Sequence, residues 1–102
     1  MWLLLTDSAF SVVQDRNDAG KVLVRSRDTA GLSRWFPGEP VVSLPNADYP
    51  HRVVITRERL AAFLAAATEQ ITYSNFKDAV TDTHRHEWYL QVYGAWWEAH
   101  RD

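Results

Sequence analysis

The stretch YPHRVVITRERLAAFLAAATEQI, residues 49–71, decides the fold because its hydrophobic period changes in the middle. Before Thr56, every second residue shares a face, so one face carries Tyr49, His51, Val53 and Ile55. Thr56 is a good helix N-cap, and after it the apolar residues recur with the helical period, at Leu60, Phe63, Leu64, Ala67 and Ile71. The sequence therefore predicts a strand that leads directly into an amphipathic helix.

Short β-prone segments precede this stretch. Residues 40–44 are expected to form a strand that pairs with residues 49–55 across a turn-forming Pro-Asn-Ala-Asp segment. Residues 2–6, 10–14 and 21–27 have the same character, and the last two should form a hairpin. In residues 21–27 the alternation assigns Val22, Val24 and Ser26 to the core face, so the opposite face carries Leu23, Arg25 and Arg27. These arginines are expected to face outward or to line a groove.

Three further helical segments are expected. Thr29 should cap a short helix that ends at Phe36, before Pro37-Gly38. Ser74 should cap a helical turn that buries Phe76 and Val80. Asp82 or Thr83 should begin a final helix toward His100, and its expected buried stripe is Val92 and Trp96, with Trp88 or Tyr89 one turn earlier.

The predicted fold class is α+β. An antiparallel sheet of two β-hairpins is expected to carry helices packed on one face, in a ββαββα-like layout followed by C-terminal helices. With 102 residues, the chain is long enough for one hydrophobic core and too short for two independent ones. The sequence therefore predicts a single domain over residues 1–102.

Composition excludes several classes of function. A formal charge of −2 provides no general attraction for a polyanion, so nucleic-acid binding is not expected. The chain has no cysteine, which excludes disulfides, thiolate metal sites and a catalytic thiol, and is consistent with a reducing compartment. The apolar start, residues 1–5, lacks a basic region and is too short for an export signal, and no segment approaches the length of a membrane span. The expected location is the cytoplasm.

Several collinear motifs carry a resemblance. They are Met1-Trp2, Phe10-Ser11-Val12-Val13, Leu23-Val24-Arg25-Ser26-Arg27, Ala47-Asp48-Tyr49-Pro50-His51-Arg52, Tyr73-Ser74-Asn75-Phe76-Lys77 and Tyr89-Leu90-Gln91-Val92-Tyr93. Together they resemble a family of small bacterial and phage-borne proteins of unknown function. The chain departs from the family pattern at Thr72, where an acidic residue is usual, and at Tyr93, where tryptophan is common. The resemblance implies a fold over nearly the whole chain and no activity.

One group of polar residues is a candidate ligand site. If the two hairpins lie side by side, a basic pocket suited to a small anion or a nucleotide would form from Arg25, Arg27, Tyr49, Arg52, Asn75 and Lys77. Guanidinium groups bind phosphate and carboxylate bidentately, so this domain would bind such a ligand or act on it. The alternative is that the arginines form ion pairs with Asp28, Asp48 and Asp78 and hold the loops in place.

The sequence offers no catalytic or metal centre. His84 and His86 lie two residues apart at the start of a helix, so their side chains point about 200° apart and cannot chelate one ion. Glycine-rich phosphate loops, nucleophile elbows and paired-carboxylate motifs are absent from the sequence. No catalytic residue, metal or cofactor is predicted, and a non-enzymatic role is favoured over an unusual enzyme.

The last candidate surface is aromatic. Three of the five tryptophans, Trp88, Trp96 and Trp97, lie near the C-terminus with Tyr89 and Tyr93, and one helix face cannot bury them all. Exposed aromatics are enriched at protein interfaces, so an interface is predicted at Trp88, Tyr89, Tyr93 and Trp97. The alternative is that Trp97 covers the rim of the sheet. The favoured function is therefore a small interaction or regulatory module, phage-related, which binds an unidentified protein partner or a second copy of itself.

Overall fold

The structure, a computed structural model, describes residues 1–101. It divides into two compact units, Met1–Thr72 and a C-terminal unit that begins at Tyr73. The first unit contains a sheet and two helices, α1 (Ala30–Trp35) and α2 (Arg57–Glu69). The second contains α3 (Phe76–Ala79) and α4 (Thr83–Ala99). That the two units form one domain stays a prediction.

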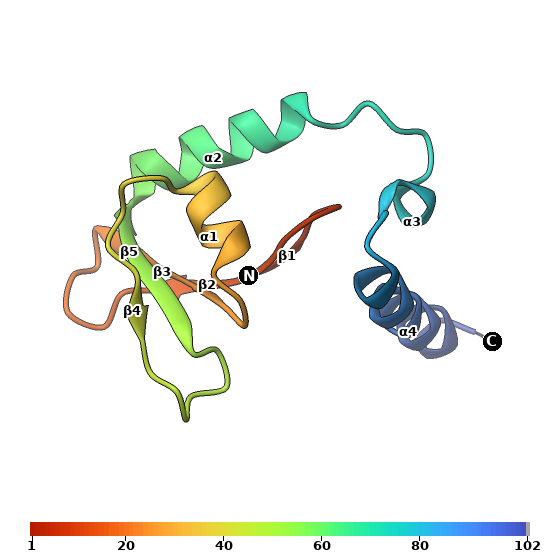
Figure 1. Ribbon diagram of the computed structural model, residues 1–102, viewed down its shortest axis with the longest axis horizontal. Coiled ribbons are helices and arrows are strands. Elements are labelled where there is room, and N and C mark those ends of the chain that lie inside the picture. The colour runs from red at the N-terminus through yellow and green to blue at the C-terminus, as the bar shows by residue number, and fades with distance from the viewer. Residues whose placement is uncertain (102) are drawn as a thin grey trace. The chain divides into compact units, whose positions relative to one another are not determined.

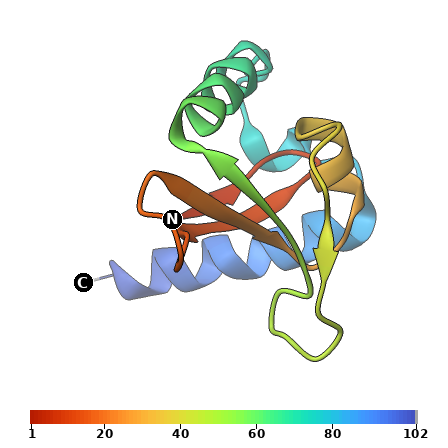
Figure 2. The same ribbon diagram turned by 90° about the vertical axis from the view of Figure 1, so that its left-hand side faces the viewer.

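The sheet has five antiparallel strands in the order β1-β2-β3-β5-β4 (Figures 1 and 2). The strands are β1 (Trp2–Leu4), β2 (Ala9–Gln14), β3 (Lys21–Ser26), β4 (Val42–Ser43) and β5 (His51–Thr56). Both predicted hairpins form, and β3 joins them by pairing with β5, which places Val24 opposite Val53. The predicted α+β class is confirmed.

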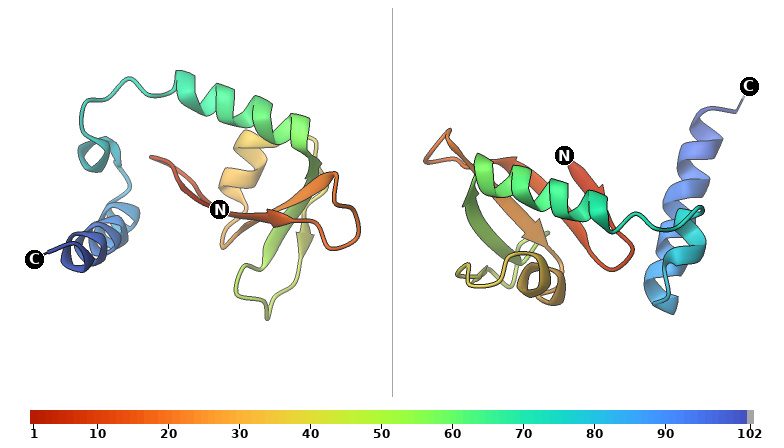
Figure 3. Two further views of the ribbon diagram at one scale, coloured as in Figure 1. Left: turned by 180° about the vertical axis from the view of Figure 1, so that it is seen from behind. Right: turned by 90° about the horizontal axis from the view of Figure 1, so that it is seen from above.

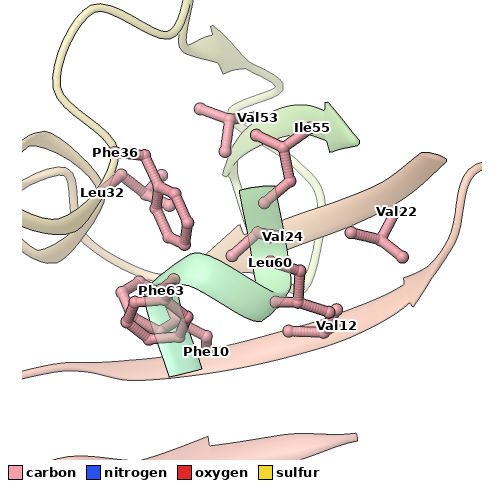
Figure 4. Packing of buried hydrophobic residues seen from close by; sticks show 10 residues of the cluster. All are labelled: Phe10, Val12, Val22, Val24, Leu32, Phe36, Val53, Ile55, Leu60 and Phe63. Carbon is pink, nitrogen blue, oxygen red and sulfur yellow. The ribbon is translucent and has the colours of Figure 1, made fainter. Parts of the chain in front are cut away.

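The hydrophobic core lies between one face of this sheet and helices α1 and α2 (Figure 4). The sheet contributes Phe10, Val12, Val22, Val24, Val53 and Ile55, the helices contribute Leu32, Leu60 and Phe63, and Phe36 joins them from the C-cap position of α1. The alternation read along residues 21–27 is therefore correct, since Val22, Val24 and Ser26 are all buried.

An aromatic cluster joins the two helices to the sheet. The ring of Phe63 lies 4.9 Å from that of Phe36, 5.2 Å from that of Trp35 and 5.7 Å from that of Phe10, measured between centroids. Arg59 also donates a hydrogen bond from Nη2 to the carbonyl oxygen of Trp35 at 2.7 Å. Edge-on and tilted ring pairs of this kind stabilise a core beyond the area that they bury. Phe63 is therefore the residue through which α2 contacts both α1 and β2.

Local signals explain where α2 begins and ends. The hydroxyl of Thr56 accepts a hydrogen bond from the backbone N–H of Arg59 at 3.0 Å, as its N-cap position predicts. The helix ends at Glu69, and the N–H of Ile71 bonds the carbonyl oxygen of Thr68 in a turn. Ile71 is consequently 59% exposed, so its assignment to the apolar stripe is wrong.

Other boundaries also differ from those predicted. The first strand ends at Leu4 because Leu5 N–H bonds the carbonyl oxygen of Ser8, which starts a turn. The fourth strand is only Val42–Ser43. At the start of α1, Thr29 occupies the N-cap position without a side-chain cap hydrogen bond, and Asp28 accepts from Gly31 N–H at 3.4 Å instead.

In the C-terminal unit α3 is a single short helix and α4 is a rod of seventeen residues (Figure 3). The cap of α3 is Asn75, whose side chain accepts from Asp78 N–H at 3.1 Å, so the prediction of Ser74 as the cap is wrong. The cap of α4 is Asp82, one of the two residues that the sequence left open, and it accepts from Arg85 N–H at 2.7 Å.

A side chain at Gly31 is predicted to disturb the packing of α1 against Ser8. A Cβ at this position would lie 2.8 Å from Ser8 Oγ and 2.9 Å from Ser8 Cβ, and Ser8 is itself buried. Gly31→Ala should therefore lower the free energy of unfolding by about 1–3 kcal/mol in urea titrations, although alanine is the better helix former. Gly94→Ala in α4 is the matched control, because a Cβ there meets nothing within 4 Å and should not lower stability. Equal losses in the two variants would contradict this packing.

A second prediction concerns the aromatic cluster. Phe63→Ala should lower the free energy of unfolding by about 3–5 kcal/mol, because it removes a ring shared by three aromatic neighbours and leaves a cavity. The neighbouring Leu64→Ala is the control, since Leu64 is only partly buried against the same core. Urea titrations of both variants should give the larger loss for Phe63→Ala; the reverse order would show that α2 is not anchored by this ring.

Candidate functional sites

The first candidate site is on α4, and only the N-terminal half of that helix is packed. Tyr89 is 4% exposed. Its ring stacks on Phe76 at 5.6 Å with an interplanar angle of 15°, and meets the edge of Trp88 at 4.4 Å. Arg85 Nη1 donates to Tyr89 Oη at 3.2 Å. Tyr89, predicted at the interface, is therefore an interior residue that joins α3 to α4.

The C-terminal half of α4 is exposed instead. Trp96 is 69% exposed and Trp97 is 55% exposed, while Val92 and Tyr93 are each more than two-fifths exposed. The prediction that Val92 and Trp96 form the buried stripe is wrong. The reason is one of length: α3 has four residues, and the aromatic contacts that its segment makes on α4 are to Tyr89 and Tyr93.

The exposed large apolar side chains of α4 share one face of the helix over its last turns. At about 100° per residue, Val92, Trp96, Tyr93, Trp97 and Leu90 fall in that angular order within an arc of about 160°. The acidic residues Glu87 and Glu98 lie on the opposite side of the helix by the same count. We call the exposed set Leu90, Val92, Tyr93, Trp96 and Trp97 the aromatic face.

A shallow groove follows the end of this face. Its volume is about 460 Å³, and it is lined by Tyr93, Trp96, Trp97, His100 and Arg101. The ring of His100 is held by a contact of 3.0 Å between its Nδ1 and the carbonyl oxygen of Trp96. Arg101 pairs with Glu98 at 3.1 Å, so the charged residue at the rim is neutralised locally. The groove is thus apolar at its centre and polar at one end.

Asn75 and Lys77, predicted at a ligand site, have structural contacts within the C-terminal unit. Asn75 caps α3 with its side-chain oxygen. The ammonium of Lys77 lies 4.4 Å from the centre of the Tyr93 ring, a cation–π contact that holds Tyr93 beside the groove. Both residues therefore help to shape the helical unit that carries the aromatic face.

The second candidate site is formed by the other four predicted ligand residues, which the first unit brings together. Arg25 and Arg52 are direct cross-strand partners on β3 and β5, on the face of the sheet opposite the core. The guanidinium of Arg25 lies 4.9 Å from the centre of the Tyr49 ring, and Arg52 Nη2 donates to the carbonyl oxygen of Tyr49 at 2.9 Å. Arg27 Nη1 donates to the carbonyl oxygen of Asp48. We call Arg25, Arg27, Tyr49 and Arg52 the arginine cluster.

Within the first unit, the predicted ion pairs of these arginines with Asp28 and Asp48 do not form, whereas pairing with Asp78, which belongs to the other unit, stays a prediction. The arginines do have the loop-holding role that the alternative gave them. They hold the loop before β5 through its backbone carbonyl oxygens, and Asp48 contributes its main chain only. The carboxylate pairing that is seen in the first unit joins Asp7 and Arg34. Within the first unit, no carboxylate lies at ion-pair distance from the guanidinium groups of the cluster.

The sequence missed one member of this second site. Ser11 Oγ accepts a hydrogen bond from Arg25 Nη2 at 2.8 Å, and it is buried on the sheet face that also carries the arginines. One row across all five strands, aligned by the register, therefore reads Trp2, Ser11, Arg25, Arg52 and Val42. Strand alternation alone assigns each residue to a face, but only the register shows that they are aligned.

The histidines do not gather. Over residues 1–101 no three His, Asp or Glu side chains are placed to hold a metal ion. His51 contacts Ser43 Oγ through Nδ1 at 2.9 Å, and His84 and His86 lie in the first turn of α4. Among the described helices, none combines the length and the apolar character that crossing a membrane requires.

Comparisons with known proteins add no function to either site. No protein-family model matches the chain, and no match was found among curated proteins or solved structures. Function is therefore inferred from the two sites themselves.

Proposed function

We propose that this protein is an interaction module that uses the aromatic face of α4 to bind another protein chain, and that the first such chain is a second copy of itself. The observation that carries the proposal is the exposure of Tyr93, Trp96 and Trp97 together on one uncharged stretch of helix. Large aromatic side chains lose little conformational entropy on binding and bury much apolar area, so they act as anchors at interfaces.

The charge of the face and of the chain is compatible with a second copy as the occupant. The five side chains of the face are uncharged, and the ammonium of Lys77 lies against them on the ring of Tyr93. The chain as a whole carries a net charge of only −2, which does not oppose association at a distance. A two-fold axis through the face would place Trp96 and Trp97 of one chain against the same residues of the other, which is the self-complementary arrangement of most homodimers.

The small size of the C-terminal unit also favours burial of its aromatic face. It contains about thirty residues, which is below the size at which a chain usually buries enough surface to fold alone. Its buried side chains are Val80 and Tyr89, whereas five large apolar side chains of α4 are exposed. Burial of the aromatic face would therefore stabilise α4 as well as join two chains. A regulatory role in the cytoplasm, where a chain without cysteine loses nothing to reducing conditions, is part of this proposal.

The test is light scattering coupled to size-exclusion chromatography over a wide range of protein concentration. The wild-type chain should be a dimer that dissociates on dilution. Trp97→Ala should raise the dissociation constant by about tenfold or more, because the loss of a large interface anchor costs at least about 1.4 kcal/mol.

The matched control is Trp2→Ala, which removes an exposed tryptophan from the first unit. It should leave the dissociation constant unchanged, and circular dichroism should show native helix content in both variants. A wild-type chain that is monomeric at every concentration, or equal weakening by both substitutions, would refute self-association through α4.

A further inference from the structure

We infer that Arg25 and Arg52 form a binding site for an oxyanion group, phosphate or carboxylate, on the sheet face opposite the core. This inference does not depend on α4 or on the proposed self-association, because every residue in it belongs to the first unit. The ligand that we expect carries at least two negative charges.

The register of β3 and β5 brings the two arginines together. Arg25 and Arg52 are directly opposite each other on neighbouring antiparallel strands, where side chains are close enough to interact. Like charges in such positions repel each other and destabilise the sheet. Arg27, two residues beyond Arg25 along the chain, adds a third positive charge at the same end of β3. A bound anion would turn this repulsion into attraction.

The existing contacts of Arg25 and Arg52 position their guanidinium groups without neutralising their charge. Arg25 donates to Ser11 Oγ and stacks on Tyr49, and Arg52 donates to the carbonyl oxygen of Tyr49. All of these partners are uncharged. Tyr49 touches both arginines, one through its ring and one through its main chain, so it fixes their relative position. A pre-positioned pair loses less entropy when a ligand binds.

The guanidinium groups of Arg25 and Arg52 have unused hydrogen-bond donors and are partly shielded from solvent. Each guanidinium has five N–H donors, and in each of these two arginines Nη2 makes one hydrogen bond. The Nε atoms of Arg25 and Arg52 are shielded from solvent and have no hydrogen-bond partner. Partial burial of this kind lowers the local dielectric constant and strengthens attraction to an anion.

The geometry also indicates which donors meet the ligand. Because both Nε atoms are buried, the ligand oxygens are expected to contact the Nη groups. Phosphate and carboxylate have the oxygen spacing that matches guanidinium groups. A dianion or trianion matches the charge of two or three arginines better than a single carboxylate does. Diphosphate and tricarboxylate are therefore the probes of choice.

The experiment measures the Tm of the full chain by thermal unfolding and its affinity by isothermal titration calorimetry. The probes are pyrophosphate and citrate, each compared with sodium chloride at equal ionic strength. We expect a rise in Tm that saturates with ligand concentration, as binding to the folded state alone requires. A rise with pyrophosphate only assigns the site to phosphate, a rise with citrate only assigns it to carboxylate, and a rise with both supports the shared chemistry. No rise above that in sodium chloride with either probe overturns the inference.

Variants separate this site from general charge. Arg25→Gln and Arg52→Gln should each weaken binding by about tenfold or more, the effect of losing one charge-assisted contact. Arg57→Gln is the matched control, because Arg57 also donates to a carbonyl oxygen and to a side-chain oxygen, those of Ala19 and Gln14. It should leave the affinity unchanged, and equal weakening by Arg57→Gln would overturn the inference.

A conservative variant guards against misfolding. Arg25→Lys keeps the charge and removes the guanidinium fork, so it should fold and still bind several-fold more weakly than the wild type. Circular dichroism of the unliganded variants should match that of the wild type. Unchanged affinity in both Arg25→Lys and Arg52→Gln would contradict a site built on this pair.

Discussion

The pairing of β3 with β5 is the constraint on which the rest of the first unit depends. This pairing joins two hairpins into one sheet and sets Val24 against Val53 at the centre of the core. The same register sets Arg25 against Arg52 on the opposite face. A shift by one residue would exchange the faces and bury the arginines, so the hydrophobic core enforces the position of the charged pair. Two like charges are held together because the valines beside them in the sequence are buried.

Over residues 73–101, the C-terminal unit contains two helices and no strand of the sheet. Within that unit, α3 and the first half of α4 are joined by ring contacts among Phe76, Trp88 and Tyr89. These residues stabilise about half of a seventeen-residue helix and leave the aromatic face beyond them. A helix of that length gains most of its stability in water from packing, not from propensity. The exposed half is therefore the part of the chain that has most to gain from a partner.

Sequence patterns predicted the first unit well because its strands alternate clearly and its long helix has a clear N-cap and a clear apolar stripe. The alternation of Val22 and Val24, the cap at Thr56 and the stripe through Leu60 and Phe63 all appear in the structure. The errors came where tertiary contacts override pattern. Ile71 continues the helical stripe in sequence, but the chain has already turned away at Glu69.

The candidate sites were predictable to different degrees. Four predicted ligand residues do come together, while Asn75 and Lys77 make structural contacts within the helical unit. The final helix was misjudged at Val92 and Trp96 because helical period shows which residues share a face, and it cannot show how far along the helix that face is covered. Ser11 was missed since a small polar residue on a strand has no signal until the register aligns it with Arg25.

In the first unit, the local arrangement of charge differs from the net charge of the chain. The chain carries a net charge of only −2, yet two arginines lie directly opposite each other on β3 and β5. Within the first unit, Asp48 lies next to the arginine cluster and contributes only a carbonyl oxygen to it. At the distances across two strands, a local pair of like charges acts more strongly than the sum over the chain, because solvent ions screen the more distant charges within about 8–10 Å. Local field, set by the register, is therefore what an anion would meet at this face.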